Sequence, residues 1–338
     1  MRIALDAMGG DHGPAPNVAG AIRAVAAAPD LSVVLVGDQP QIEAGLYTVP
    51  PELRQRLSVV HASEVIGMHE KPTDALRKKP DSSIARCWHL VADKQVDGLV
   101  SAGNTGAVVA SGLFIKRFLK GIRRPGIAAV MPTATGRTVI LDVGANVWPK
   151  PLHLLHYGVM GSVFAEQMLG IPQPKIGLMN VGEEEGKGHE LIQKTYELFR
   201  NSPLRDRFAG NVEGRDIHKG VVDVIVTDGF VGNVVLKHAE GVFDFIMSLV
   251  GQDVISALTT ERETARAAVK NLIGKFHYST FGGAPLLGID GICMICHGAS
   301  DERAIANALG AAAQDARVQL NEKITQAIAA LPAFQDLE

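Results

Sequence analysis

Apolar positions along the chain alternate between short continuous runs and longer stretches of helical spacing. The short runs are rich in Val, Ile and Leu and predict buried strands, which fall in the ranges 2–6, 31–36, 57–61, 97–101, 127–131, 138–142, 175–181, 208–213, 221–227, 286–290 and 292–297. Between them, apolar residues three or four positions apart predict helices, of which the clearest are 14–28, 83–95, 108–119, 151–169 and 299–330. The alternation predicts an α/β fold with three αβα layers, in which helices cover both faces of a mostly parallel sheet.

Two segments depart from this alternation. Residues 65–83 have no clear period and contain two prolines, so we expect a long loop there, and such loops often carry function. Residues 239–276 are helical throughout, with Arg and Lys interleaved among apolar positions, and predict an inserted amphipathic helical hairpin. Its apolar face either joins the core or a dimer interface, or lies on a membrane surface. We expect residues 1–338 to form a single αβα catalytic unit, with two interleaved subdomains as the alternative.

Composition narrows the function classes. The formal net charge is −3 and 5% of residues are aromatic, so the chain has neither the basic field nor the stacking surface that nucleic acid requires. No apolar run is long enough to span a membrane, and the N-terminus is too short and polar for a signal peptide. Three cysteines fit a reducing cytoplasm. Two basic clusters, at 77–79 and 116–124, are either solvated faces or docking sites for an acidic partner.

Glycine-rich polar turns follow at least five of the predicted strands, and the central one is V-S-A-G-N-T-G-A at 100–107. Here a strand ends and a helix begins, which leaves backbone N–H groups unpaired at the positive end of the helix dipole. The turn predicts an anion site with candidate phosphate ligands Ser101, Gly103, Asn104, Thr105 and Gly106. A single such turn is more often plain loop geometry. Five of them at the carboxyl edge of one parallel sheet predict a phosphate-bearing or polar ligand.

Several familiar motifs fail on inspection. C-M-I-C-H at 293–297 matches the haem attachment string but falls in an apolar strand, so we interpret both cysteines as buried structural thiols. G-E-E-E-G-K-G at 182–188 has the wrong spacing for a P-loop and carries three carboxylates where phosphates would bind. No G-x-G-x-x-G follows the first strand, and neither H-E-x-x-H nor G-x-S-x-G occurs. We expect no metal and no cofactor.

Six motifs taken together are more specific than any single turn. In order along the chain they are M-R-I-A-L-D-A-M-G-G-D-H-G-P, S-A-G-N-T-G-A, D-V-G-A-N, G-N-V-E-G-R-D, D-G-F-V-G-N-V-V-L-K and G-G-A-P-L-L-G. From residue 1 to about 330, the chain thereby resembles the PlsX-type phosphate acyltransferase family of bacterial phospholipid synthesis.

The resemblance implies that a long-chain acyl group moves from acyl carrier protein to inorganic phosphate. The acyl-phosphate product would then feed a downstream membrane acyltransferase in phospholipid (phosphatidic acid) synthesis. It also implies a homodimer in the cytoplasm with peripheral membrane contact. The implied fold is similar to that of phosphotransacetylases and of isocitrate/isopropylmalate dehydrogenases.

Under this resemblance the polar turns acquire candidate roles. Phosphate is largely dianionic near neutral pH and needs positioning more than deprotonation. Asn146, Asn233 or backbone amides near 229–232 are candidates to stabilise the oxyanion that forms on the thioester. The other catalytic candidates are Lys237 and His12, as proton donors or charge partners, and Asp228, as an orienting group. The remaining candidates line the substrate loops, namely Asp6, Gly9, Gly10, Asp11, Glu213 and Gly229.

The acidity of the carrier protein gives both basic clusters a candidate role in docking it, the first through Arg77, Lys78 and Lys79 and the second through residues 116–124. For every side chain named above, structuring of its own loop is the equally weighted alternative. Three rival functions stay open. They are a phosphotransacetylase-like enzyme acting on short-chain acyl-coenzyme A, a metal- and nicotinamide-dependent dehydrogenase, and a non-enzymatic acyl or phosphate binding protein.

Overall fold

The computed structural model describes residues 1–115, 117–276 and 282–332, with the side chains of 272–276 excepted. In these ranges eleven strands form one sheet. In sheet order they are β3 (Leu57–His61), β2 (Ser32–Gly37), β1 (Arg2–Asp6), β4 (Gly98–Ser101), β11 (Ile292–Ile295), β10 (Ala284–Leu287), β5 (Gly126–Thr133), β6 (Gly136–Leu141), β9 (Val224–Val226), β7 (Ile176–Met179) and β8 (Phe208–Val212). The predicted strands are all present, most of them with slightly different ends.

The sheet consists of two parallel groups. β3, β2, β1, β4 and β11 form the first group, and β6, β9, β7 and β8 form the second. Between them, β10 pairs antiparallel with β11 and with β5, and β5 pairs antiparallel with β6. Three antiparallel pairings reverse the second group relative to the first. The expected single row of carboxyl-end turns is therefore corrected to two loop clusters, one for each group.

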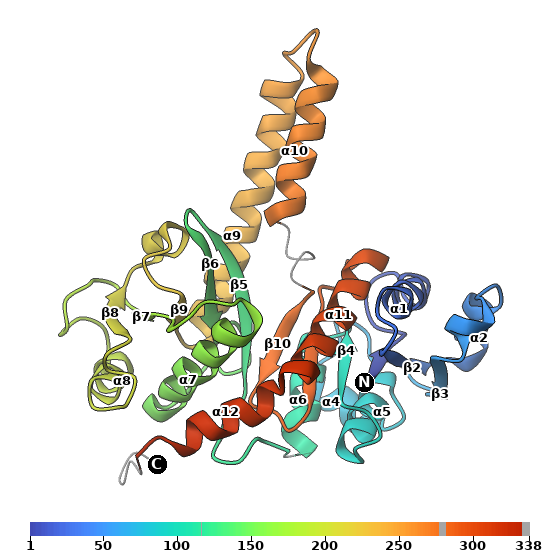
Figure 1. Cartoon of the computed structure of the whole chain (residues 1–338), viewed down its shortest axis with the longest axis horizontal. Coiled ribbons are helices and arrows are strands. Elements are labelled where there is room, and N and C mark those ends of the chain that lie inside the picture. Colours follow the sequence, from blue (N-terminus) through green and yellow to red (C-terminus); the bar gives the residue numbers. More distant parts are fainter. Residues whose placement is uncertain (116, 277–281, 333–338) are drawn as a thin grey trace.

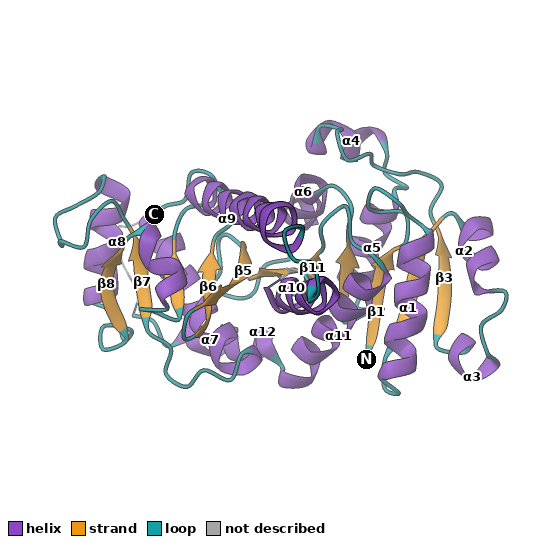
Figure 2. Cartoon of the chain, turned by 90° about the horizontal axis from the view of Figure 1, so that it is seen from above, coloured by secondary structure: helices purple, strands orange, loops and turns teal. Residues whose placement is uncertain are grey.

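Helices cover both faces of the sheet, as the predicted three-layer architecture requires (Figure 2). One face carries α1 (Ala15–Ala27), α11 (Glu302–Val318), α12 (Leu320–Ala329) and α7 (Pro151–Met168), and the other carries α5 (Ser83–Ala92), α6 (Thr105–Ile115) and α9 (Gly229–Leu249). Strand side chains alternate between the layers. Ile3 and Leu5 of β1 pack in the cluster with α1 and α11, while Ala4 packs in the cluster with α5 and α6.

The helical hairpin rises from the middle of the molecule, between the lobe that contains α7 and α8 (Glu190–Arg200) and the lobe that contains α1 and α2 (Gln39–Leu46) (Figure 1). It starts at Gly229, ten residues earlier than predicted, because Asp228 caps α9 and the first turns of α9 pack against the sheet. Val231 and Val235 make that packing, and only the later part of α9 projects. A π-helical stretch, Val250–Ile255, leads toward the tip, and α10 (Arg262–Phe276) returns.

Other differences from the prediction are local. The expected loop at 65–83 contains the helix α4 (Pro72–Lys78), and a further short helix, α3 (Pro51–Arg54), precedes β3. The single helix expected over 299–330 is divided, because Gln319 adopts a left-handed conformation with φ +53° between α11 and α12. This break lets Leu320, Ile324 and Ile328 pack in the same cluster as α7. Within the described ranges, no helix is both long and apolar enough to cross a bilayer.

Candidate functional site

The first loop cluster lies at the carboxyl ends of β1, β4 and β11. A Cβ atom added to Gly9, in the loop after β1, would lie 2.6 Å from the backbone nitrogen of Gly103, in the loop after β4. The backbone N–H of Asp11 donates to the carbonyl of Gly298, in the loop after β11, at 2.8 Å. Three segments far apart in sequence therefore meet around the turn that was predicted to bind an anion.

Asp6 anchors this cluster from inside. Its carboxylate is fully buried and accepts hydrogen bonds from Ser101 Oγ at 2.7 Å and from the Met8 backbone N–H at 3.3 Å. Burial raises the pKa of Asp6, and hydrogen bonds from Ser83, Ser101 and the loop amides oppose that shift. Ser101 Oγ also accepts from the Gly103 N–H at 3.0 Å. The prediction that the Ser101 hydroxyl binds phosphate is therefore corrected, because this buried hydroxyl orients Asp6 and the turn instead.

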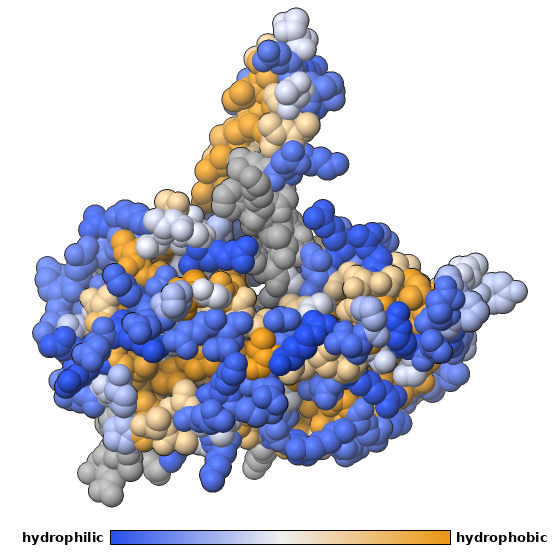
Figure 3. All heavy atoms as spheres, viewed as in Figure 1, coloured by the Kyte–Doolittle hydropathy of each residue, from blue (hydrophilic) through white to orange (hydrophobic). Residues whose placement is uncertain are grey.

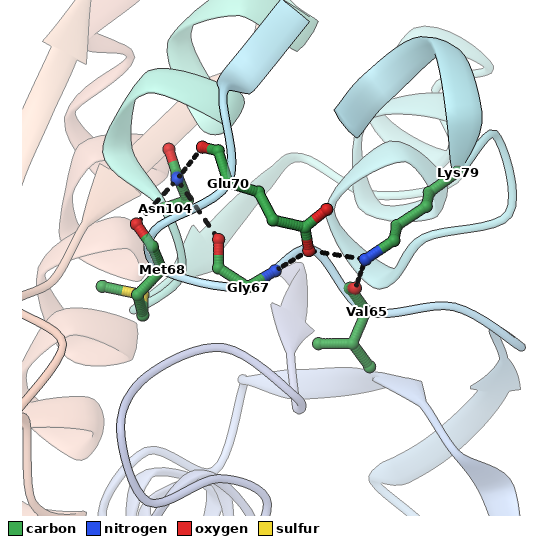
Figure 4. A network of polar contacts seen from close by, with 6 residues as sticks. All are labelled: Val65, Gly67, Met68, Glu70, Lys79 and Asn104. Atoms are coloured by element: carbon green, nitrogen blue, oxygen red, sulfur yellow. Dashed lines mark hydrogen bonds and ion pairs between the residues drawn. The ribbon is translucent and has the colours of Figure 1, made fainter. Parts of the chain in front are cut away.

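The Asn104 side chain is also committed to the protein (Figure 4). Its Nδ2 atom donates to the carbonyls of Gly67, Met68 and Glu70 at 3.3, 3.0 and 3.0 Å, while its Oδ1 caps α6 by accepting from the Ala107 N–H at 3.0 Å. Asn104 thus holds the loop at 67–70 against the start of α6. The expectation that its side chain binds phosphate is corrected on this point.

The backbone of the turn keeps the properties of an anion site. In the described part of the chain, the N–H groups of Asn104, Thr105 and Gly106 have no hydrogen-bond acceptor. Thr105 is exposed, and α6 behind it has eleven residues, enough to place a positive dipole end here. A Cβ atom on Gly106 would lie 2.5 Å from Cγ of Pro72, so α4 closely covers this turn.

The loop that leads into α4 is tied down by Glu70 and Lys79 (Figure 4). Glu70 Oε1 accepts from the Gly67 N–H at 2.6 Å and from Lys79 Nζ at 2.5 Å, and Lys79 also donates to the carbonyl of Val65 at 2.8 Å. The Lys79 ammonium, followed by the Gly67 amide, lowers the pKa of Glu70. Lys79 therefore holds the loop before α4, and its docking role stays a prediction. Arg77 and Lys78, at the end of α4, are exposed.

The second loop cluster is organised by Asp142, directly after β6. Its buried carboxylate accepts from the backbone N–H groups of Ile127, Gly144, Ala145 and Asn146 at 2.7–3.1 Å. Burial raises the pKa of Asp142, and these four amides oppose the shift. Asp142 therefore shapes this turn in the same way that Asp6 shapes the first.

Asn146 links the second cluster together. Its Nδ2 atom lies 2.6 Å from the carbonyl oxygen of Pro125 and 2.8 Å from the hydroxyl of Tyr157 in α7, and its own carbonyl accepts from the Gly229 N–H at 2.8 Å. The side-chain amide is therefore already engaged. The expected oxyanion-stabilising role of Asn146 is corrected to positioning of the loop.

The start of α9 offers no free amides in its first turn. Asp228 caps the helix by accepting from the N–H groups of Phe230 and Val231, both at 2.9 Å, and Gly232 N–H bonds to the Asp228 carbonyl. Gly229 N–H is taken by Asn146, so the prediction that amides at 229–232 hold an oxyanion is corrected. Asn233 is exposed, lies beside Gly144 and has no side-chain hydrogen bond to the described residues.

The other candidates fall at the rim of the clusters. His12 and Asp11 are exposed on the loop after β1, and Gly10 lies in the same loop with φ +95°. Lys237 is exposed on α9 and pairs with Glu240 at 2.8 Å, and its role as a proton donor or charge partner stays a prediction. Glu213, after β8, is paired with Arg215 at 2.8 Å.

Sequence reasoning missed three residues of this architecture: Glu70, Asp142 and Tyr157. A signal for Asp142 was available, because Asp6, Asp142 and Asp228 each follow an apolar strand and stand shortly before a glycine. Glu70 and Tyr157 left no such signal, since neither stands in a glycine-rich turn after a predicted strand and their side-chain partners, Lys79 and Asn146, lie nine and eleven residues away.

A cavity of about 460 Å³ lies elsewhere, at the amino ends of β1, β2 and β3. It is polar, with Arg2, Arg56 and Asp97 among its lining residues. Ligands of open α/β sheets bind at the opposite, carboxyl ends of the strands. We therefore keep the two loop clusters, and not this cavity, as the candidate site.

Solved structures define the class of fold. A phosphotransacetylase from Streptococcus pyogenes matches with a TM-score of 0.57 at 15% identity, covering 97% of this chain and 94% of that chain. A 4-hydroxythreonine-4-phosphate dehydrogenase from Burkholderia phymatum matches with a TM-score of 0.50 at 14% identity, covering 93% and 97%. The fold is thus one that phosphotransacetylases and a dehydrogenase share, as predicted.

Sequence comparisons define the family. A family model described as "Fatty acid synthesis protein" matches residues 1–323. Phosphate acyltransferase from Dictyoglomus turgidum is 46% identical over 331 residues, which cover 97% of this chain and 98% of that relative. Phosphate acyltransferase from Nitratidesulfovibrio vulgaris is 47% identical over 330 residues, covering 97% and 95%. The chain belongs to the phosphate acyltransferase family and is an acyltransferase, which confirms the resemblance.

Proposed function

We propose that this enzyme transfers a long-chain fatty acyl group from acyl carrier protein to inorganic phosphate, and that the acyl-phosphate serves phospholipid synthesis. The observation that carries the proposal is the set of three backbone N–H groups without acceptors at Asn104, Thr105 and Gly106. Backbone amides at a helix N-terminus suit a small oxyanion, and Pro72 of α4 packs closely against the turn at Gly106. Family membership supports the same reaction class.

In the proposed reaction, a phosphate oxygen held at this turn attacks the thioester carbonyl carbon. A bond forms between that oxygen and the acyl carbon, the carbon–sulfur bond breaks, and the carrier leaves as a thiolate that takes up a proton. A free thiol has a pKa of about 8.5, so the carrier thiolate can leave without being protonated by a strong acid. His12 is our candidate donor, because the loop after β1 borders the anion turn and His12 is exposed on it.

The transient oxyanion requires a hydrogen-bond donor. We assign this role to Asn233, because its side-chain amide is exposed and uncommitted to the described residues, whereas that of Asn146 is engaged. The helices that carry the two sites, α6 and α9, belong to one hydrophobic cluster and lie beside each other in Figure 2. The two turns follow strand groups that run in opposite directions, so this assignment has its own test: wild-type kcat in Asn233→Ala would contradict it.

The test is a direct assay of the product. The purified protein is incubated with palmitoyl carrier protein and phosphate, and acyl-phosphate is trapped with hydroxylamine as the hydroxamate. Product from the carrier-bound substrate supports the proposal. Product from acetyl-coenzyme A alone would favour a short-chain phosphotransacetylase, and no product from either would contradict both acyl-transfer functions.

We further propose that the hairpin mediates homodimer formation and peripheral membrane contact, with the product passing to a membrane acyltransferase. Val242, Phe245, Ile246 and Leu249 recur at helical spacing on α9 and are all exposed, Phe245 by 62%. Figure 3 shows this apolar surface along one side of the projecting hairpin. An apolar stripe of this kind requires a partner subunit or a lipid surface to cover it.

A further inference from the structure

Two loops beside the second cluster bring basic residues together. The hydrogen bond of 2.6 Å between Asn146 Nδ2 and the Pro125 carbonyl joins the loop at 142–150 to the segment before β5. Arg123 and Arg124 directly precede Pro125, and Lys150 ends the other loop at the start of α7. All three basic side chains belong to exposed residues. Their convergence is therefore a property of the fold and not of one sequence segment.

The same positive charges act on the buried histidines of α7. Burial lowers the pKa of His153 to about 4, and the charges of Arg124, Lys150 and Arg123 contribute to that shift in this order. His156 is lowered to about 4 as well, by burial, by His153 and by Arg123. The start of α7 has the matching geometry, because the Lys150 backbone N–H donates to His153 Nδ1 at 3.0 Å. Asp142 is buried and saturated by backbone amides, so it does not screen the three cations at the surface.

Apolar groups accompany these charges. Trp148 is 93% exposed and Val147 is 47% exposed, both on the loop that ends at Lys150. A tryptophan so exposed on a single chain marks an interaction surface, and Trp and Arg are the side chains that most often dominate binding energy at protein interfaces. Arginine also pairs with carboxylates through two parallel hydrogen bonds.

We propose that Arg123, Arg124, Val147, Trp148 and Lys150 form a docking surface for an acidic protein. We identify this acidic protein as the carrier that delivers the acyl group, an identification that rests on the proposed function. The surface borders the catalytic loops, because Asn146 bonds both to Pro125 and to Gly229 at the start of α9. The net charge of −3 disfavours nucleic acid as the occupant, and the apolar stripe suited to a bilayer lies on the hairpin instead.

The test compares charge reversals at matched exposed positions. The variant R124E/K150E changes the charge by the same amount as R205E/K194E, a control on the region of α8 and β8 whose side chains are 70% and 53% exposed. We expect R124E/K150E to raise KM for acyl carrier protein by about tenfold or more, with kcat and the KM for a neutral acyl-N-acetylcysteamine thioester unchanged. W148A is expected to raise the same KM. For the wild type, binding of the carrier protein should weaken between 50 and about 500 mM salt.

Other outcomes overturn the docking surface. An unchanged KM for acyl carrier protein in R124E/K150E, or a rise in that KM found only in R77E/K78E, would place the docking surface at the end of α4. Loss of flotation with anionic vesicles at an unchanged KM would assign the surface to lipid. Direct binding of carrier protein, followed by surface plasmon resonance, separates the two hypotheses. If the wild type makes no acyl-phosphate, the proposed reaction fails, while lost or retained binding in R124E/K150E still decides the docking surface.

Discussion

The Nδ2 atom of Asn104 lies 3.0 Å from the carbonyl oxygen of Glu70, and this contact joins the anion turn to the loop that precedes α4. Glu70 in turn binds Lys79 through its carboxylate, so α4 is held at both ends over the first turn of α6 (Figure 4). The turn at 103–106 therefore depends on a cover that is distant from it in sequence.

Replacing Asn104 by Ala should lower stability as well as phosphate binding. The change removes the cap of α6 and three hydrogen bonds to the loop, so we expect a loss of about 1–2 kcal/mol in the free energy of unfolding and a raised KM for phosphate. Urea denaturation and steady-state kinetics measure the two effects. Asn104→Asp keeps the cap acceptor but sets a carboxylate oxygen against the carbonyls of Gly67, Met68 and Glu70, so it should recover neither the stability nor the phosphate affinity. Wild-type phosphate kinetics in Asn104→Ala would show that the anion binds at another turn.

Gly106→Ala tests whether α4 covers the anion site. The new methyl group would meet Pro72 at 2.5 Å, so α4 must shift and the KM for phosphate should rise by about tenfold. Gly241→Ala in α9 is the matched control, since nothing lies within 4 Å of its Cβ position and alanine favours a helix by up to about 1 kcal/mol. Equal phosphate kinetics in the two variants would show that the cover has no role in binding.

Asp6→Asn should destabilise the first loop cluster. The Ser101 hydroxyl and the Met8 amide donate to different oxygens of this carboxylate, and asparagine keeps only one acceptor oxygen, so one of the two donors would face an NH₂ group. We expect the free energy of unfolding to fall by about 1–3 kcal/mol, as measured by urea denaturation, while the exposed control Asp11→Asn leaves it unchanged. Wild-type stability in Asp6→Asn would mean that burial keeps Asp6 protonated, in keeping with its raised pKa.

Stability should fall on acidification between pH 6.5 and about 4. The pKa values of His153 and His156 drop from 6.5 in the unfolded chain to about 4 in the fold. In this interval the unfolded chain binds more protons, so the free energy of unfolding falls with pH, by up to about 3 kcal/mol per histidine when the window has been crossed. Chemical denaturation at several pH values measures the slope. His156→Gln should flatten it and the exposed control His238→Gln should not, and equal slopes in both would contradict the assignment.

Phe245→Glu together with Ile246→Glu should abolish flotation with anionic liposomes. Two charges would then lie on the exposed apolar stripe of α9, where transfer into lipid becomes unfavourable. S248E/Q252E adds the same charge at exposed polar positions of the hairpin and is the control. Light scattering on the same variants detects a change from dimer to monomer. A variant that still floats would exclude the described stripe as the lipid contact.

The class of fold could be predicted because strand and helix patterns in this chain are strongly periodic. The strand at 98–101 and the helix after it followed from Gly98–Ser101 and the glycine-rich turn alone. The reversal between the two strand groups could not be predicted, since it arises from β10 and β5, whose pairing partners are set by tertiary packing. Likewise, the division at Gln319 depends on the left-handed conformation of an ordinary glutamine.

The sequence located the candidate site, but the structure gives its polar side chains a different role. Polar side chains in glycine-rich turns suggested ligands, yet Ser101 and Asn104 use their hydrogen-bonding groups to hold the loops. A polar side chain in such a turn can hydrogen-bond either to backbone groups or to a ligand. Only its partners in the folded structure show which of the two it binds. The groups left for phosphate are backbone amides, which every residue type provides and no motif can specify.

The position of β11 has a consequence for how the chain folds as it leaves the ribosome. β11 is formed by residues 292–295, yet it pairs with β4, formed by residues 98–101, and β10 joins it to the second strand group. Until residues 292–295 have been synthesised, β4 keeps an open edge and the two halves of the sheet have no connection through strands. Open strand edges favour aggregation of nascent chains, so truncation before residue 292 should yield insoluble protein, where a chain built from sequential domains would yield a folded fragment.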